Sequence, residues 1–290
     1  MMQVIPTGEV LGARIEGLNL ANPLNDGEAS AVANALGEHG LLRFPGQRLS
    51  ALNLRDFSAH FGDLEINVIG AYQEPGIPQV MILSNILENG KQTGLKDAGQ
   101  GWHTDLSYAE PVALANVLYA IRIPHRDGQP LGATEFCDMG AAYDDLSADM
   151  KRRLEGLTAL HDFGKFWDMM RARPGSTRGP LSDAQRKEKP PVSHPIIITH
   201  PITRRKLLYA NPGYAVRVNE LPKVQSDALL EFLFEHQVQD KYRYAFRWQE
   251  GDLLMADNLR TIHQAVPDYG PDEHRLLKRC QVIATRFAPQ

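Results

Sequence analysis

Short apolar runs separated by turn-forming residues recur along the 290-residue chain. Examples are residues 41–44 (LLRF), 79–85 (QVMILSN) and 133–139 (ATEFCDM). Runs of this length, bounded by turn residues, are typical of buried strands. The sequence shows neither a regular alternation of strands with helices nor a glycine-rich phosphate-binding loop, which argues against a Rossmann fold. The sequence therefore predicts a β-rich α+β protein whose strands form the core and whose helices flank it.

Periodic apolar residues and capping signals predict where the other elements begin and end. Asp26 and Ser50 are expected to cap the first two helices, and Gly40 is expected to end the first. The predicted elements are helices at 26–39, 50–60, 141–157 and 226–238, a strand or strand pair at 112–123, hairpins through 201–205 and at Glu250-Gly251, and a final strand at 277–287.

Residues 164–192 are polar, basic and proline-rich, with little periodicity. A structureless connection of this length is uncommon in a compact domain and is often a lid over a site. We therefore expect residues 1–290 to form a single domain that carries a lid or flexible segment at 164–192.

The charge balance restricts the partners. The formal net charge is −4, so there is no overall basic field of the kind that nucleic-acid binding requires. No stretch approaches the roughly 18 apolar residues of a membrane span, and the start does not resemble a signal peptide. Cys137 and Cys280 lie far apart and outside any CxxC pair, which is typical of reduced thiols. We expect a cytoplasmic protein without a nucleic-acid or membrane partner.

The stretch GWHTDLSY, residues 101–108, contains His103 and Asp105. On a strand, residues two apart point to the same face, so the imidazole and the carboxylate would converge. With one distant histidine they would complete a 2-His-1-carboxylate triad, which suits non-haem Fe(II). The similar pair His125 and Asp127 lies in a turn-rich loop, where no strand would align the two side chains.

The third ligand must come from far along the chain. The candidates are His161, His194, His200, His236, His263 and His274. His263 stands out because it follows an apolar strand and precedes a strand with Arg275 and Arg279, which would share one face. A buried arginine binds a carboxylate in a bidentate geometry that lysine cannot reproduce. An Fe(II) site beside such an arginine is what a 2-oxoacid co-substrate requires.

From about residue 8 to residue 287, the chain resembles the taurine dioxygenase / 2,4-dichlorophenoxyacetate dioxygenase (TauD/TfdA) family of Fe(II)- and 2-oxoglutarate-dependent oxygenases. The motifs that carry the resemblance are LRFPGQ, GDLE, WHTDLSY, GATEFCDM, HPIIITHPITRRKLLYAN, WQEGDLLMADN, HQAVPDY and HRLLKR. The resemblance implies a double-stranded β-helix, or jelly-roll, core. It also implies Fe(II) as cofactor, 2-oxoglutarate and O₂ as co-substrates, and release of succinate and CO₂.

Carried over residue by residue, the resemblance implies that His103, Asp105 and His263 are the iron ligands. Thr134 stands in GAT where the family usually has GDT, and it matches a hydroxyl that helps to bind the distal carboxylate of 2-oxoglutarate. Arg275 matches the salt-bridge partner of that same carboxylate.

Four residues match substrate-binding positions of the family. Arg279 matches an arginine between the co-substrate and an anionic substrate, so it is assigned to both. Leu106 matches a residue whose backbone N–H meets the substrate, and Phe163 matches an aromatic pocket wall. Asn67 replaces a histidine of the taurine enzyme, and Gly99 replaces an asparagine. The carboxylate-binding lysine of the aryloxyalkanoate branch, expected near residue 68, is absent.

These departures argue against compact, very polar taurine. We expect a small organic anion with an apolar or aromatic body, such as an aryloxyalkanoate, oxidised beside a heteroatom by a homo-oligomeric enzyme, a dimer or tetramer. The apolar residues expected near the substrate are Val68, Ile69, Tyr72, Phe166, Trp167, Met169 and Met170. Two alternatives remain open. One is a taurine, alkylsulfonate or alkylsulfate dioxygenase; the other is a non-catalytic metal-binding β-sandwich, which would need neither Thr134 nor Arg275.

Overall fold

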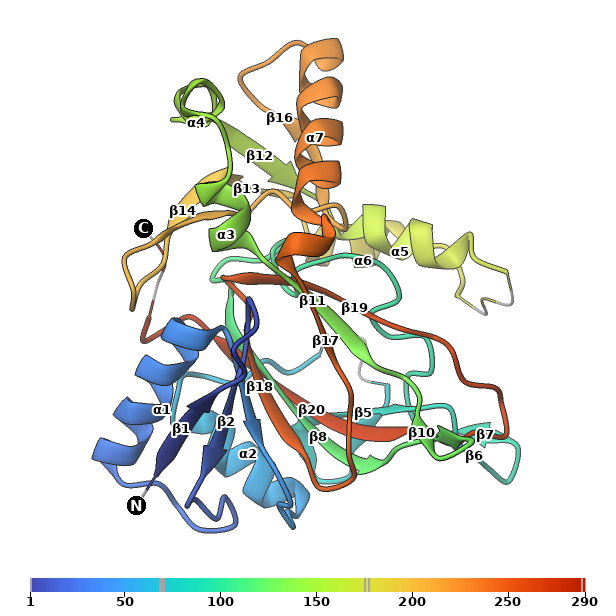
Figure 1. The fold of residues 1–290 in the computed structure, drawn as a ribbon. Helices are drawn as coiled ribbons and strands as arrows, with labels where there is room; N and C mark the ends of the chain where they lie inside the picture. The colour runs from blue at the N-terminus through green and yellow to red at the C-terminus, as the bar shows by residue number, and fades with distance from the viewer. Residues whose placement is uncertain (1, 68–70, 175, 177, 288, 290) are drawn as a thin grey trace.

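A large, almost entirely antiparallel sheet forms the base of the molecule in this computed structural model, which describes residues 2–67, 71–174, 176, 178–287 and 289 (Figure 1). Within the described residues the sheet has eight strands, and only the β2–β3 pair is parallel. In spatial order they are β1 (Gln3–Pro6), β2 (Ala13–Glu16), β3 (Leu41–Phe44), β18 (Leu253–Asp257), β8 (Ala113–Arg122), β20 (Leu276–Ile283), β5 (Ile77–Ser84) and β4 (Gln73–Glu74).

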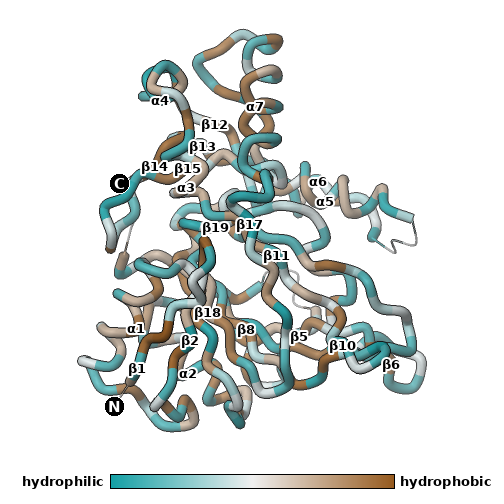
Figure 2. The backbone as a smooth tube through the Cα atoms, in the orientation of Figure 1, coloured by the Kyte–Doolittle hydropathy of each residue, from teal (hydrophilic) through white to brown (hydrophobic). Residues whose placement is uncertain are grey.

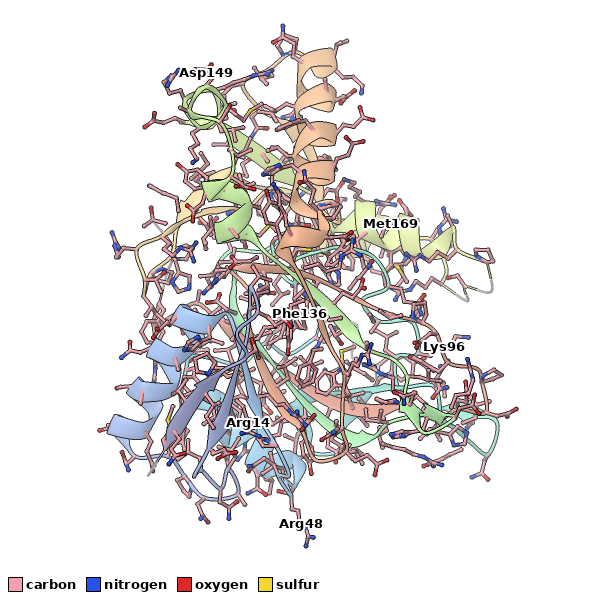
Figure 3. The ribbon with its side chains drawn as sticks, viewed as in Figure 1. Arg14, Arg48, Lys96, Phe136, Asp149 and Met169 are labelled. Carbon is pink, nitrogen blue, oxygen red and sulfur yellow. The ribbon has the colours of Figure 1, made fainter. Side chains whose placement is uncertain are left out.

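A smaller antiparallel sheet lies over this one. Its strands, in order, are β17 (Arg243–Phe246), β11 (Thr134–Asp138) and β19 (Thr261–Ala265). Phe136 of β11 points between the two sheets, where it packs in one buried cluster with Phe246 and with Leu277 of β20 (Figure 3). The two sheets therefore enclose one hydrophobic layer.

Two helices cover the opposite face of the large sheet. These are α1 (Asp26–His39) and α2 (Ala51–Ala59), which pack on β3, β18, β20 and β5. Because β8 is covered on both faces, its residues 113–117 are all buried. The central strands carry hydrophobic stretches while the peripheral loops are largely hydrophilic (Figure 2).

The remaining elements lie above the small sheet and at the edges (Figure 1). The strands are β12 (Thr158–His161), β13 (Val192–Pro195), β16 (Ala215–Val218), β14 (Ile197–Thr199), β15 (Lys206–Leu208), β6 (Leu87–Glu88), β7 (Lys91–Gln92), β9 (His125–Arg126) and β10 (Gln129–Pro130). The helices are α3 (Met139–Asp144), α4 (Ala148–Leu154), α5 (Phe163–Arg171), α6 (Asp183–Glu188), α7 (Lys223–Gln237) and the 3₁₀ turn η1 (Asp240–Tyr242). Among the described residues, no helix has the length and apolar character needed to cross a membrane.

Several predicted boundaries are confirmed, and others are wrong for identifiable reasons. Gly40 ends α1 in the left-handed conformation, and Ser50 caps α2. The cap of α1 is Asn25 rather than Asp26, because Asn25 accepts a hydrogen bond from the Glu28 N–H in a capping box.

The helix predicted over 141–157 is two helices. Ser147 caps α4 by accepting from the Met150 N–H, which interrupts the run.

The turn-rich loop around His125 contains the small β9–β10 hairpin. Run 112–123 is one long strand, and both cysteines are free and buried.

The turn at Glu250 and Gly251 is present, but the strands on either side do not form a hairpin. β17 pairs with β11 in the small sheet, whereas β18 pairs with β3 and β8 in the large one. The turn therefore carries the chain from one sheet to the other. Local sequence fixes the turn, but it does not determine which strands pair across it.

The segment 164–192 is not structureless where it is described. It contains most of α5, all of α6 and the start of β13. Helix α5 buries Phe166 and Met170 against the protein and exposes its polar side. Residues 175 and 177 lie outside the described residues.

Candidate functional site

His103, Asp105 and His263 meet between the two sheets. His263 lies on β19, and its backbone pairs with that of His103 through two hydrogen bonds of 2.8 and 3.0 Å. The His103 Nε2 atom lies 3.4 Å from Asp105 Oδ1, and His263 Nε2 lies 3.7 Å from Asp105 Oδ2. One nitrogen or oxygen atom from each of the three residues lies within 4.8 Å of the others.

The prediction that these side chains converge is confirmed, but the strand assumed for it is wrong. His103 makes a single bridge to His263, and the chain then turns through Leu106, which has a positive φ of 54°. The bridge to β19, rather than a two-residue strand repeat, brings the ligand atoms together. The alternative pair, His125 and Asp127, is exposed.

The protonation of the cluster suits a cation. His103 Nδ1 lies 2.7 Å from the Gly101 carbonyl, so this nitrogen donates a hydrogen bond to it and Nε2 is turned toward Asp105. Burial, reinforced by His103, lowers the pKa of His263 to about 3, which keeps it neutral. Burial alone would raise the pKa of the Asp105 carboxyl, but the Arg279 guanidinium, 3.0 Å away, holds it well below its usual range.

Asn258 holds the backbone of Asp105 in place, a role that was not predicted from the sequence. Its side chain accepts from the Asp105 N–H at 3.1 Å and donates to the Asp105 carbonyl at 2.8 Å and to Ala113 at 3.1 Å. Asn116 donates to the same amide oxygen at 2.9 Å. The sequence does show an asparagine directly after the apolar run of β18. Its hydrogen-bond partner, Asp105, can be identified only from the fold.

Close packing fixes the His103 ring. Phe166 of α5 lies against it, with ring centroids 4.7 Å apart. Gly213 allows this approach, because a Cβ there would lie 2.6 Å from His103 Cβ. A Cβ at Gly99, whose φ is +71°, would lie 3.3 Å from His103 Cε1, so a side chain at this position would press on the ring.

Thr134 lies on β11, next to the strand that carries His263. Thr134 is paired with Ala265 on the adjacent strand, so it shares the inner face with His263, which is paired with Phe136. Its hydroxyl accepts from Trp248 Nε1 at 3.0 Å and keeps its own proton free to donate.

Arg275 is buried and unpaired with any carboxylate among the described residues. Its guanidinium carbon lies 5.9 Å from the centre of the Tyr269 ring, and its Nε has no hydrogen-bond partner. Gly132 makes room for it, because a Cβ there would lie 2.7 Å from Nε. Since burying an unpaired charge is costly, the site is suited to receive a carboxylate.

The four predicted substrate residues border one pocket beside Asp105. Asn67, Leu106, Phe163 and Arg279 all line it. Arg279 donates to Asp105 Oδ2 at 3.0 Å, so it links this pocket to the metal-ligand cluster. Tyr108, Glu65, Lys189 and Gln281 complete the lining and were not predicted.

The apolar residues predicted around the substrate are dispersed. Phe166 lies against His103, Met170 is buried, and Trp167 packs on Phe163 with centroids 5.9 Å apart. Met169 is 36% exposed, and its Cε would lie 3.1 Å from a Cβ at Gly101. Val68 and Ile69 lie outside the described residues, and Tyr72 does not line the pocket beside Asp105.

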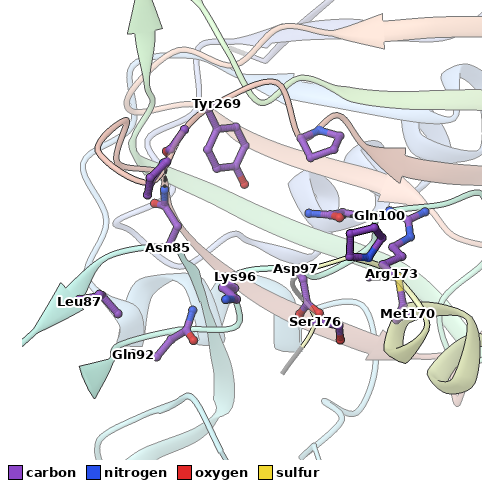
Figure 4. Close-up of a pocket in the computed structure, with 14 residues that line it drawn as sticks. Asn85, Leu87, Gln92, Lys96, Asp97, Gln100, Met170, Arg173, Ser176 and Tyr269 are labelled. Atoms are coloured by element: carbon purple, nitrogen blue, oxygen red, sulfur yellow. Dashed lines mark hydrogen bonds between the residues drawn. The ribbon is translucent and has the colours of Figure 1, made fainter. Parts of the chain in front are cut away.

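A larger pocket of about 350 Å³ opens on the Arg275 side (Figure 4). It is bordered by Tyr269 and Asn85, which both contact Arg275, and by Gln100, Met170 and Arg173. Arg275 itself lies outside this lining and borders a small adjoining cavity, which shares Lys96 and Tyr269 with the larger pocket.

A buried cluster of two histidines and one carboxylate between two facing sheets is typical of mononuclear non-haem iron oxygenases. The family described as "Taurine catabolism dioxygenase TauD, TfdA family" matches residues 3–281. The chain belongs to this TauD/TfdA family, and it is a 2-oxoglutarate-dependent dioxygenase, an oxidoreductase. The non-catalytic metal-binding module is thereby ruled out.

Individual relatives support this membership. The alpha-ketoglutarate-dependent 2,4-dichlorophenoxyacetate dioxygenase of Burkholderia sp. (strain RASC) is 34% identical over 283 residues, which cover 94% of this chain and 91% of that protein. The crystal structure of AAD-2 with Mn(II) and N-oxalylglycine has a TM-score of 0.81 at 26% identity and covers 99% of both chains. A taurine dioxygenase structure from Burkholderia xenovorans has a TM-score of 0.77 at 26% identity, covering 97% of this chain and 89% of that one.

Proposed function

We propose that the protein is an Fe(II)- and 2-oxoglutarate-dependent dioxygenase that hydroxylates a small organic anion, such as an aryloxyalkanoate, beside a heteroatom. The observation that carries this proposal is Arg275, which is buried, has no carboxylate partner among the described residues and lines a different cavity from the pocket beside Asp105. The cavity at Arg275 suits 2-oxoglutarate, and the pocket beside Asp105 suits the acidic substrate. Succinate and CO₂ would be the products of the co-substrate.

The three proposed ligands fit a divalent metal. Ligand atoms at about 2.1 Å from one octahedral ion lie about 3 Å apart, close to the 3.4 and 3.7 Å contacts of Asp105 with the two imidazoles. When bound there, Fe(II) would supply the activation of O₂ that hydroxylation needs.

The protein's own side chains would hold and orient the two acids. Arg275 and Thr134 would bind the distal carboxylate of 2-oxoglutarate, with Arg275 in a bidentate pair. Arg279 would orient the substrate from its place beside Asp105, and Leu106 and Phe163 would form the apolar wall. Phe166 would exclude water from the His103 side.

The facing sheets are proposed to be the two halves of a double-stranded β-helix. The antiparallel pairing and the buried layer between the sheets support this assignment. The segment 164–192 is proposed to serve as a lid within a single domain, since Phe166 and Lys189 both reach the site from it. We also propose a homo-oligomer in the cytoplasm, to be checked by light scattering and cell fractionation.

Direct competition tests the substrate class. The iron-loaded enzyme is offered a phenoxyalkanoate and taurine at equal concentration with 2-oxoglutarate, and succinate and the organic product are measured. Succinate coupled to the aryl acid is expected, because the pocket has an apolar wall and lacks the two polar residues replaced at Asn67 and Gly99. Efficient coupling to taurine without turnover of the aryl acid would support the sulfonate alternative instead.

A further inference from the structure

The end of α6 places a lysine in the pocket beside Asp105. Lys189 follows the last helical residue, and its side chain, 20% exposed, lines the same pocket as Asn67, Phe163 and Arg279. Of the other basic residues of α6, Lys187 is exposed and does not line the pocket. Among the described residues, Lys189 and Arg279 are the two cations at this pocket.

The partner of Lys189 holds it loosely. Its Nζ lies 3.7 Å from Glu65 Oε1, which is longer than the roughly 2.7–2.9 Å of a charge-assisted hydrogen bond. The Glu65 backbone is anchored, because its N–H donates to the Gln281 carbonyl at 3.0 Å. The flexible lysine stem can redirect the ammonium from Glu65 into the pocket.

The balance of charges around the pocket indicates that Lys189 affects which substrate charge the pocket accepts. A divalent ion and Arg275 together offset Asp105 and the two carboxylates of 2-oxoglutarate. Arg279, Lys189 and Glu65 then leave one excess positive charge at the pocket, and removal of Lys189 would leave none. Arg279 alone does not fill this role, since its guanidinium already pairs with Asp105 at 3.0 Å.

We propose that Lys189 is the residue that selects a monoanionic substrate. Its ammonium exchanges Glu65 for the carboxylate of the substrate, while the apolar body lies against Leu106 and Phe163. Lys189 thus takes the part of the lysine that the aryloxyalkanoate branch carries near residue 68, but it comes from a different segment. This inference rests on the proposed function, because it specifies which residue binds the carboxylate of the proposed substrate.

Anaerobic calorimetry tests the proposal without turnover. Phenoxyacetate is titrated into full-length enzyme loaded with Fe(II) and 2-oxoglutarate. Lys189→Met keeps the stem but removes the charge, and it should raise the Kd about tenfold or more. Lys189→Arg should retain most of the affinity. The matched control Lys187→Met should bind as the wild type does, and neutral phenoxyacetamide should bind wild type and Lys189→Met equally.

Glu65→Gln separates recognition from a merely structural ion pair. Removing the competing carboxylate should leave the Kd for phenoxyacetate unchanged or lower it. An equal loss of affinity in Glu65→Gln and Lys189→Met would overturn the inference, because the ion pair would then only stabilise the local structure. A wild-type Kd in Lys189→Met would overturn it as well, yet leave the proposed function standing. A wild type that binds and oxidises taurine but not phenoxyacetate would overturn both.

Discussion

At the scale of single residues, Arg275 is a buried charge that has no carboxylate partner among the described residues. Its burial without a carboxylate partner predicts that it holds the distal carboxylate of 2-oxoglutarate. Breaking a buried ion pair costs about 3–5 kcal/mol, or roughly 10²- to 10⁴-fold in affinity. Arg275→Ala should therefore raise the KM for 2-oxoglutarate by at least two orders of magnitude, and Arg275→Lys should recover only part of it. An unchanged KM in the alanine variant would move the assignment to Arg279.

Asn258 is predicted to be a positioning residue for Asp105. Asn258→Ala removes four hydrogen bonds around one buried backbone segment. The metal Kd should rise about tenfold, because loss of groups that orient ligands typically costs 10- to 100-fold. Calorimetric titration with Mn(II) measures this. Asn219→Ala, which removes hydrogen bonds to Thr158 and Ser193 far from the site, should leave the metal Kd unchanged. Equal effects of the two variants would show that Asn258 acts only on stability.

The sequence indicated the ligand types but not what holds them. The two-residue spacing indicated His103 and Asp105 as a ligand pair, although a bridge to β19 rather than a strand repeat brings them to His263. The positions of His263 and Arg275 after the last apolar strands, together with the resemblance, indicated the other two residues. Asn258 had no such pattern, since its hydrogen bonds reach a residue 153 positions away. Long-range contacts of this kind depend on the sheet pairing, which local residues do not determine.

At the scale of elements, the connection between α5 and α6 is tied down beside the site. Arg178 forms a bidentate pair with Asp97 at 2.8 and 2.9 Å, and its guanidinium carbon lies 4.8 Å from the centre of the Trp167 ring. Both partners are largely buried, with side-chain exposures of 13% and 19%. This contact therefore holds the connection to the loop that precedes the cluster.

Loss of that pair should loosen the segment. Arg178→Ala should raise the rate of subtilisin cleavage between α5 and α6 about tenfold, because hydrogen bonds to charged groups contribute about 1.5–3 kcal/mol. Arg186→Ala is the matched control, since its pair with Asp168 is more than 40% exposed and should contribute little. Equal cleavage rates in the two variants would contradict a closing role for Arg178.

The predicted helix boundaries were correct where capping and turn residues give a strong local signal. They were wrong where contacts with distant residues determine the structure. Ser50 and Gly40 mark helix ends that the structure keeps. The break at Ser147 was missed because apolar residues continue on both sides of it. Helix α5 was missed although Phe166 and Met170 lie four apart, the spacing of one helix face, because the polar and proline-rich residues after it dominate the composition of 164–192. The burial of these two side chains depends on contacts with His103 and Tyr214.

At the scale of the whole molecule, the site exists because β11, β19 and the 101–108 loop meet over the large sheet. His103 and His263 are 160 positions apart, yet their backbones are hydrogen-bonded. A β-rich core with flanking helices was predictable from the periodicity. The crossing from β17 to β18 between sheets was not, because the turn at Gly251 is compatible with either pairing.

The metal centre is the central claim, and its stoichiometry tests it most directly. Anaerobic calorimetric titration with Fe(II) should give one ion per chain for the wild type and for Asp127→Ala, in which the exposed pair is removed. His103→Ala and His263→Ala should bind no stoichiometric Fe(II), because each leaves only two ligands. Unchanged binding in His103→Ala together with loss of binding in Asp127→Ala would contradict the account.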